Sequence, residues 1–181
     1  MEALRGVITP ERIAGIVEKT RKAVDPFAES LPDSIYLKAT LDQRDEILKN
    51  LPGDAEKAYQ YYLDSLENPM PFFLGNAETE NGMLSLSWDA AYDFDGEFVR
   101  YDVQVSSDWD FAQVLFEKTG TLETRAELPV PEEGEYFWRV TAKNESGRKQ
   151  VAFDSIVTAS GAHHGMRRFV ITGDGEAVNE E

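Results

Sequence analysis

The hydrophobic pattern of this chain changes its period at Pro69. Before Pro69, apolar residues recur at steps of three and four, which is the spacing of one face of an α-helix. After Pro69, apolar and polar residues alternate, which is the spacing of a β-strand with one buried face. One segment cannot satisfy both periods. The pattern therefore predicts an α+β protein with segregated units, a small N-terminal helical segment followed by an all-β sandwich.

The helical segment is expected to span residues 1–68 and to hold about three helices. Thr9, Pro10 and Glu11 form a helix start, with a capping hydroxyl, a proline at the first helical position and an acid near the positive end of the dipole. Pro26 is expected to end this helix. Its apolar stripe comprises Ile13, Ile16, Val17, Thr20 and Val24.

Two further helices are expected in the rest of this segment. Thr40 and Gln43 form a capping box, and Asp54 caps another apolar stripe. We interpret the tyrosines of this stripe as packing residues rather than as a ligand platform, with Tyr61 as the exposed member. The stripe comprises Ala55, Ala58, Tyr59, Tyr62, Leu63 and Leu66.

Residues 69–172 are predicted to form a β-sandwich, and residues 173–181 an acidic tail. Turns rich in Gly, Asn, Asp and Glu separate the strands at intervals typical of sandwiches. The strand at 136–142 places Phe137, Arg139 and Thr141 on the face opposite its apolar one. The other expected strands are 83–88, 99–105, 112–119, 124–130 and 149–155.

The formal net charge of −16 narrows the class of partners. The part before Pro69 has 9 basic and 13 acidic residues, and the part after it has 9 basic and 21 acidic residues. Such a surface repels polyanions, so we expect no nucleic-acid partner. No run of about 18 apolar residues occurs, so no membrane insertion is expected. A protein or polysaccharide partner stays open, with the chain a monomer or weak oligomer.

Three signatures in the second unit resemble a fibronectin type III domain over about residues 70–158. Tyr136, Trp138, Val140 and Ala142 alternate as in the penultimate strand of that family, and Trp88 resembles the tryptophan of its second strand. The segment FVRYDVQVSSD resembles its third strand. The resemblance implies an immunoglobulin-like sandwich in which the hydroxyl of Tyr136 bonds to backbone upstream.

The chain departs from that family at both ends of the domain. The usual proline-rich opening is reduced to NPMPFFLG. A further segment, GAHHGMRRFVIT, follows the expected last strand at 149–155.

The order of segments also resembles the C-terminal region of CotH-type spore coat proteins, an atypical secreted kinase family. The resemblance rests on LRGVITPERIAGIVEKTRKAVDP, a YYLDSL helix and the acidic fibronectin-like unit. It implies a longer bacterial parent, with nucleotide-binding and catalytic segments upstream of residue 1 and a location outside the cell or on the spore surface. The 181 residues contain no glycine-rich phosphate loop and no HRD-like or DFG-like motif, so no kinase role is carried onto them.

The turn at 89–97 is the candidate metal site. Asp93, Asp95 and Glu97 lie around Gly96, and hard oxygen ligands beside a glycine turn are what Ca²⁺ requires. The turn lacks the twelve-residue frame of an EF-hand loop. A solvated acidic turn that connects two strands explains the same residues, and no other cofactor is expected.

Trp109 is the candidate partner-binding residue. It lies in SSDWDF, where it presents its ring to a sugar or a protein partner, or else covers one end of the sandwich.

The chain shows no catalytic constellation, so we expect no enzyme activity from it. His163 and His164 are the only histidines, and neighbours in an extended chain point to opposite faces. No serine lies in a nucleophile-elbow pattern. Arg167 and Arg168 are expected to pair with neighbouring carboxylates.

These observations favour a non-catalytic accessory or interaction module. Two alternatives stay open. The first is a carbohydrate- or calcium-dependent binding module that uses Asp93, Asp95, Glu97 and Trp109. The second is a domain that positions substrate for a CotH-type kinase.

Overall fold

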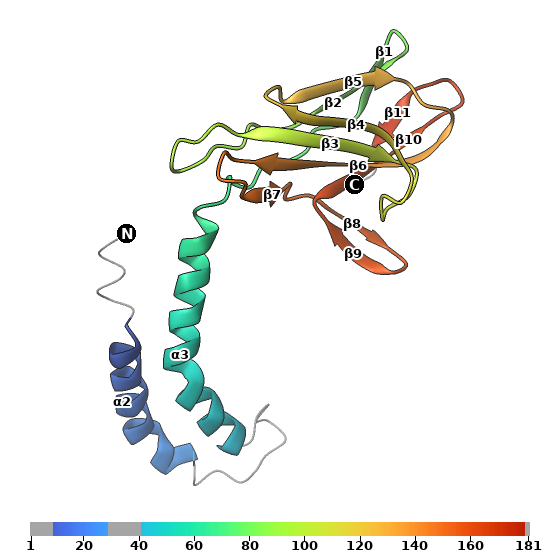
Figure 1. Ribbon diagram of the computed structural model, residues 1–181. Coiled ribbons are helices and arrows are strands. Elements are labelled where there is room, and N and C mark those ends of the chain that lie inside the picture. Colours follow the sequence, from blue (N-terminus) through green and yellow to red (C-terminus); the bar gives the residue numbers. More distant parts are fainter. Residues whose placement is uncertain (1–8, 29–40, 180–181) are drawn as a thin grey trace. The chain divides into compact units, whose positions relative to one another are not determined.

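The computed structural model describes residues 9–28 and 41–179, in two compact units that divide between Ser65 and Leu66 (Figure 1). The predicted helix start at Thr40 lies outside the described residues. The first unit contributes helices, and the described residues 66–179 contain strands and turns without a helix. The predicted fold class is confirmed.

Helix α2 spans Pro10–Ala28, as its sequence signals indicate. The hydroxyl Oγ1 of Thr9 accepts a hydrogen bond from the amide of Arg12 (3.2 Å), as an N-cap does. The prediction that Pro26 ends the helix is wrong, because Pro26 lies inside the last turn. A proline there removes only one backbone bond, and the helix continues for two residues.

Helix α3 spans Leu41–Ser65 and replaces the two helices predicted for this part of the chain. Pro52 lies within it. The apolar spacing of Ile47, Leu51 and Ala55 continues across the proline at steps of four, which explains why one helix forms. Neither α2 nor α3 combines the length and the apolar character that a membrane span requires.

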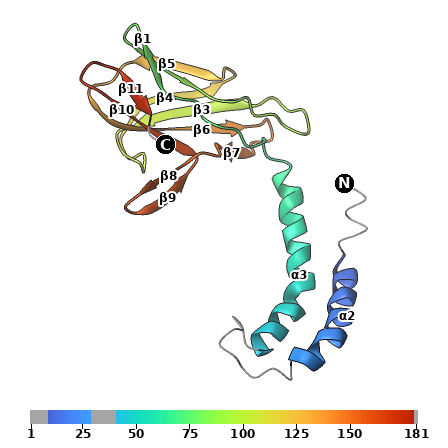
Figure 2. The same cartoon turned by 180° about the vertical axis from the view of Figure 1, so that it is seen from behind.

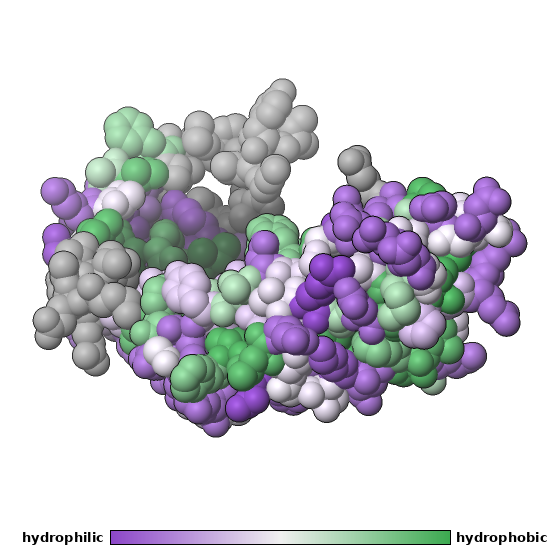
Figure 3. All heavy atoms as spheres, turned by 90° about the horizontal axis from the view of Figure 1, so that it is seen from above, coloured by the Kyte–Doolittle hydropathy of each residue, from purple (hydrophilic) through white to green (hydrophobic). Residues whose placement is uncertain are grey.

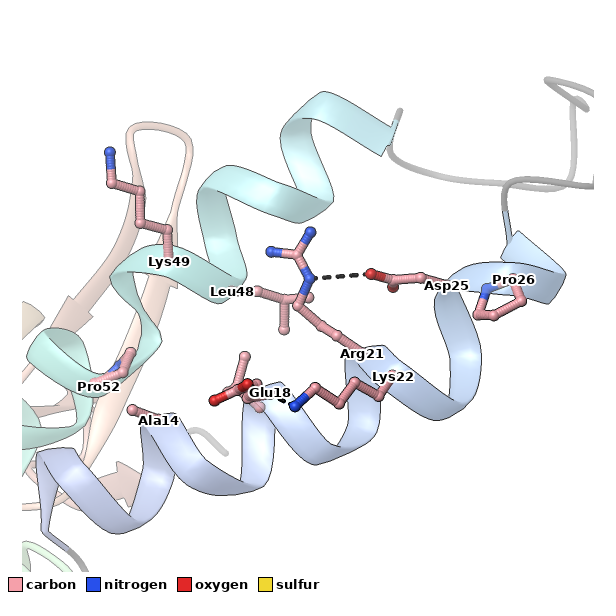
Figure 4. Close-up of a pocket in the computed structure, with 10 residues that line it drawn as sticks. Ala14, Glu18, Arg21, Lys22, Asp25, Pro26, Leu48, Lys49 and Pro52 are labelled. Atoms are coloured by element: carbon pink, nitrogen blue, oxygen red, sulfur yellow. Dashed lines mark hydrogen bonds and ion pairs between the residues drawn. The ribbon is translucent and has the colours of Figure 1, made fainter.

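The two helices contact each other through ion pairs around an open cavity. Arg21 of α2 pairs with Asp45 of α3 at 3.2 Å, and Arg44 of α3 pairs with Asp25 of α2 at 3.4 Å. The cavity between them measures about 710 Å³, and Figure 4 shows Arg21 beside Asp25 at its edge. Among residues 9–27 and 43–65, whose burial the structure describes, no side chain is buried.

The second unit is a sandwich of two main antiparallel sheets (Figures 1 and 2). The smaller sheet has the order β1-β2-β5, and the larger has the order β11-β10-β6-β3-β4, with β7 also paired to β6. The strands of the smaller sheet are β1 (Glu78–Glu80), β2 (Met83–Ser87) and β5 (Arg125–Pro129). Those of the larger sheet are β3 (Arg100–Ser106), β4 (Val114–Thr121), β6 (Gly134–Lys143), β7 (Lys149–Val151), β10 (Met166–Ile171) and β11 (Ala177–Asn179).

One apolar core fills the space between these sheets. Leu84 and Leu86 of β2 meet Val103 of β3 and Trp138 of β6 in it, and all four side chains are fully buried. Trp88 is 5% exposed, so both strand tryptophans are buried. The hydroxyl of Tyr136 donates to the carbonyl of Glu132 at 2.9 Å. The predicted tyrosine corner is therefore present.

The end of the sandwich differs from the prediction. The strand expected at 149–155 is only β7, three residues long, and β10 lies beside β6 as the last long strand. A hairpin of β8 (Ser155–Thr158) and β9 (Gly161–His164) separates β7 from β10. The predicted tail at 173–181 contributes β11, whose Val178 pairs with Val170. The fibronectin-like unit thus extends well beyond residue 158.

Candidate functional site

The acidic turn at 89–97 is held by hydrogen bonds to the rest of the sandwich. Asp93 is 8% exposed, and its two carboxylate oxygens accept from the amide of Asp95 (2.9 Å) and from Nδ2 of Asn144 (2.8 Å). Glu97 accepts from the amide of Ser146 at 2.8 Å and from its hydroxyl. Within the described ranges, no group of three or more His, Cys, Asp or Glu side chains is placed to hold a metal ion. The structure does not gather Asp93, Asp95 and Glu97 into such a group.

Asn144, directly after β6, joins three segments of the sandwich. Its Nδ2 donates to Asp93 and also to the carbonyl of Glu67 (2.9 Å), while its Oδ1 accepts from the amide of Arg148 (2.8 Å). The guanidinium of Arg148 pairs with the side chain of Glu67. One buried amide therefore fixes the chain entering the sandwich, the acidic turn and the turn after β6.

Trp109 lies in the loop between β3 and β4 and packs on a histidine of the β8–β9 hairpin. Its ring centroid is 4.0 Å from that of His163, and the ring planes are 33° apart. Trp109 is 39% exposed, so part of it stays accessible. Trp109 thus links this loop to the hairpin.

His163 is bonded to hydroxyl groups of its own hairpin. Its Nε2 lies 2.8 Å from Oγ1 of Thr158 and 3.1 Å from Oγ of Ser160. A serine nucleophile would also need a carboxylate on the other ring nitrogen. In the part of the chain that the structure describes, no carboxylate is hydrogen-bonded to His163.

The basic pair at 167–168 meets carboxylates, as predicted. Arg167 lies 3.8 Å from Asp154 and donates to the carbonyls of Leu74 and Gly75 at 3.1 and 2.8 Å. Arg168 pairs with Glu135 at 3.2 Å. These contacts tie β10 to its neighbours and give the pair a structural role.

A polar groove of about 630 Å³ lies on the outer face of the larger sheet. Its floor comes from the positions of β3 and β6 that alternate with core residues, and β7 and the end of β9 add its side. We call it the outer-face groove. It is lined by Asp102, Gln104, Glu117, Arg139, Thr141, Lys143, Lys149, Gln150, Val151, His164 and Gly165.

Arg139 is held in a fixed orientation at this groove. Its guanidinium carbon lies 3.9 Å from the ring centroid of Phe111, and its Nε donates to Oε1 of Gln104 at 2.8 Å. Gln104 in turn donates to Glu117 at 2.7 Å. Phe111 belongs to a second apolar cluster with Phe137 and Met166, so the surface that supports the guanidinium is itself packed.

The groove has more cationic than carboxylate side chains, whereas the part of the chain after Pro69 is strongly acidic. Lys143 pairs with Asp102, and this contact helps to hold the pKa of the Asp102 carboxyl below its ordinary value although burial opposes the shift. Burial lowers the pKa of the Arg139 guanidinium, which nevertheless stays charged as arginines in proteins do. Lys149 adds a third cation.

Sequence reasoning placed Arg139 and Thr141 on the polar face of their strand but did not find the groove. The groove depends on the register that sets Arg139 opposite Gln104 and Thr141 opposite Asp102. No local signal reports this pairing, because the two strands are about 35 residues apart. The signal in the sequence is that two strands each carry polar residues at every second position, which can face each other when the strands pair.

No protein-family model and no curated protein matches this chain. Among solved structures, it is similar to the fibronectin type-III domain of human fibronectin type III domain containing protein 3, with 16% identity, a TM-score of 0.39, and coverage of 58% of this chain and 87% of that one. It is also similar to a Fn3-like protein from Clostridium thermocellum, with 19% identity, a TM-score of 0.33, and coverage of 46% and 80%. A third similar structure is the twitchin kinase region from C. elegans, with 14% identity, a TM-score of 0.41, and coverage of 60% of this chain and 18% of that one.

Proposed function

We propose that this chain is a non-catalytic interaction module, in which the α2–α3 pair docks on a partner protein and the sandwich is a second folded unit of the same chain. The observation that carries the proposal is the uncovered apolar surface of the helices. Helices of soluble proteins normally bury their apolar stripe, and a large exposed apolar surface indicates an interaction site. The residues concerned are 40–76% exposed: Ile16, Val24, Ile47, Leu51, Tyr61 and Tyr62.

The contacts of the side chains that could act as an acid, a base or a nucleophile support the non-catalytic part of the proposal. Asp93 and Glu97 bind backbone and side-chain donors of neighbouring turns, and His163 binds hydroxyls of its hairpin. Each of these contacts orders a loop. A catalytic acid, base or nucleophile would instead face an accessible substrate position.

The charge distribution defines the chemistry of the partner. The part before Pro69 is nearly balanced, with 9 basic and 13 acidic residues, whereas the part after it has 9 and 21. Figure 3 shows hydrophilic residues over much of the surface, with hydrophobic residues among them. We therefore assign the helices to an apolar, weakly charged protein surface, which they would meet in the helix-in-groove mode.

We further propose that the parent is a bacterial protein of CotH type, in which this module positions substrate for a kinase segment outside the cell. The support is the resemblance carried by LRGVITPERIAGIVEKTRKAVDP, the YYLDSL helix and the acidic fibronectin-like unit. The genomic reading frame tests this part. A kinase-like segment directly upstream of Met1 supports it, and a reading frame without one contradicts it.

Site-specific photo-cross-linking tests the docking role. A photoreactive residue at Ile47 of α3 should give one discrete adduct with another protein in the source cells, and Ile16→Glu should abolish that adduct. The matched control places the same residue at Leu115 of β4, which is similarly exposed (57% against 59%). Equal adducts from both positions, or an adduct that Ile16→Glu leaves unchanged, would contradict the proposal, as would an adduct formed only with a second copy of the chain.

A further inference from the structure

The outer-face groove contains an arginine whose guanidinium is held in place for an anion, with the nearest carboxylate, that of Glu117, acting on it through its charge and through Gln104 rather than in a close ion pair. In the described residues, no ion pair within 4.0 Å involves Arg139, although its guanidinium is fixed by Phe111 and Gln104. A guanidinium presents its donors in a planar fork that matches a carboxylate. Holding the fork still before binding reduces the entropy lost when a ligand arrives.

The charges around Arg139 favour a ligand with one negative charge. The groove holds the cations Arg139, Lys143 and Lys149 against the carboxylates Asp102 and Glu117. This local excess is small and lies within a strongly acidic unit. The field of that unit repels polyanions over a longer range than the groove attracts them, so acidic peptides and polymers of repeated charge fit poorly.

The remaining lining suits hydroxyl groups. Thr141, Gln150 and His164 line the groove, and their side chains offer both donors and acceptors. The volume of about 630 Å³ lies within the range of roughly 300–1,000 Å³ found for small-molecule sites.

We propose that the outer-face groove binds a singly charged sugar acid, a uronate unit whose carboxylate is held by Arg139 and whose hydroxyls meet the polar lining. This site is independent of the α2–α3 surface, because all its residues belong to the sandwich. The proposal therefore stands or fails separately from the docking role of the helices.

Titration of the full chain with D-glucuronate, followed by ¹H–¹⁵N chemical shifts, tests the proposal. We expect saturable shifts at the amides of β3, β6 and β7, and much weaker shifts with D-glucose or acetate at the same concentration. Equal binding of D-glucose would overturn the role of the carboxylate. Equal binding of acetate would overturn the saccharide assignment, and an absence of saturable shifts would overturn the site.

Variants of Arg139 sharpen the test. Arg139→Lys keeps the charge but loses the fork, and we expect roughly tenfold or more weaker glucuronate binding, the usual effect of losing a hydrogen bond to a charged group. Arg125→Lys is the matched control, since Arg125 lies in β5 of the smaller sheet and pairs with Glu127 there. Melting curves of both variants check that each is folded. Unchanged affinity in folded Arg139→Lys would refute the proposal.

Discussion

The sandwich and the helical pair have equally regular apolar patterns but opposite burial. In the sandwich, Trp138, Val103 and Phe169 are 0% exposed. In the helices, Ile16 and Ile47 are both 59% exposed. The apolar face of each main sheet is covered by the other sheet, whereas among the described residues each helix has one helical neighbour within its unit. The difference shows that periodicity predicts which face is apolar, and that the number of packing layers decides whether this face is buried.

The two regions should therefore respond differently to the loss of an apolar side chain. Trp138→Ala empties the centre of the core, and we expect a loss of about 3–5 kcal/mol in the free energy of unfolding. Ile47→Ala removes an exposed side chain and should change the stability of the isolated chain by no more than about 0.5 kcal/mol. Urea denaturation followed by far-UV circular dichroism, which reports helices and strands together, measures both values. Similar losses in the two variants would break the comparison.

A smaller effect is expected at the buried amide that ties three segments of the sandwich. Asn144→Ala removes the donor to Asp93 and to the carbonyl of Glu67, and leaves Asp93 buried without that partner. We expect a loss of about 1–3 kcal/mol, the usual penalty for an unsatisfied buried polar group. The double variant Asn144→Ala, Asp93→Ala should recover part of this loss. If Asn144→Ala alone leaves the free energy of unfolding unchanged, the hydrogen bonds of Asn144 do not hold the three segments together.

The tyrosine corner should contribute less. Tyr136→Phe removes one hydrogen bond, from the hydroxyl to the carbonyl of Glu132, and keeps the buried ring. We expect a loss of about 1 kcal/mol at neutral pH. Thermal unfolding of the two proteins at equal concentration checks it, with Tyr61→Phe on the exposed part of α3 as the matched control. A loss of stability in Tyr61→Phe as large as that in Tyr136→Phe would contradict the assignment of Tyr136 as a tyrosine corner.

The same residue gives a pH dependence with a defined sign. Burial, and to a lesser extent the charge of Glu132, raise the pKa of Tyr136. Because the pKa of the Tyr136 hydroxyl is higher in the folded than in the unfolded state, its contribution to the free energy of unfolding is complete below the unfolded-state pKa of about 10. The contribution is lost as the pH rises through the folded-state pKa. Tyr136→Phe should therefore lose less stability between pH 9 and 11 than the unmodified chain. Parallel losses in the two proteins would exclude this contribution.

The smallest expected effect concerns calcium. Asp93 and Glu97 are already engaged by Asn144 and Ser146, so we expect Ca²⁺ to raise the melting temperature no more than Mg²⁺ at matched ionic strength. A bound ion at a hundredfold excess over its Kd would add about 2.7 kcal/mol to the stability. A calcium-specific rise that disappears in Asp95→Asn would contradict this expectation and support the metal-site hypothesis.

Local chemistry made much of this fold predictable. Thr9 and Pro10 mark the start of α2, and the alternation around Trp88 and Trp138 marks two central strands, because these signals depend only on near neighbours in sequence. The expected helix start at Asp54 was misleading, because one helix continues through Pro52, where the apolar spacing on both sides outweighs the loss of one backbone bond. Sequence context alone could not show this balance.

The features that sequence reasoning missed depend on contacts between distant residues. The role of β10 follows from its pairing with β6 across the inserted hairpin. The fixed guanidinium of Arg139 follows from a strand register and from Phe111 in a separate loop. Conversely, the pattern of acids at 93, 95 and 97 suggested a metal site, but it carries no information on the donors that surround each carboxylate.

Native-state hydrogen exchange of the isolated chain tests the contrast between the two regions most directly. Amides of β2, β3 and β6 should exchange only with global unfolding, because they lie in a closed core. Amides of α2 and α3 should exchange with a much lower opening free energy, because no side chain in residues 9–27 and 43–65 is buried. Protection of the α2 and α3 amides equal to that of β6 would contradict the account.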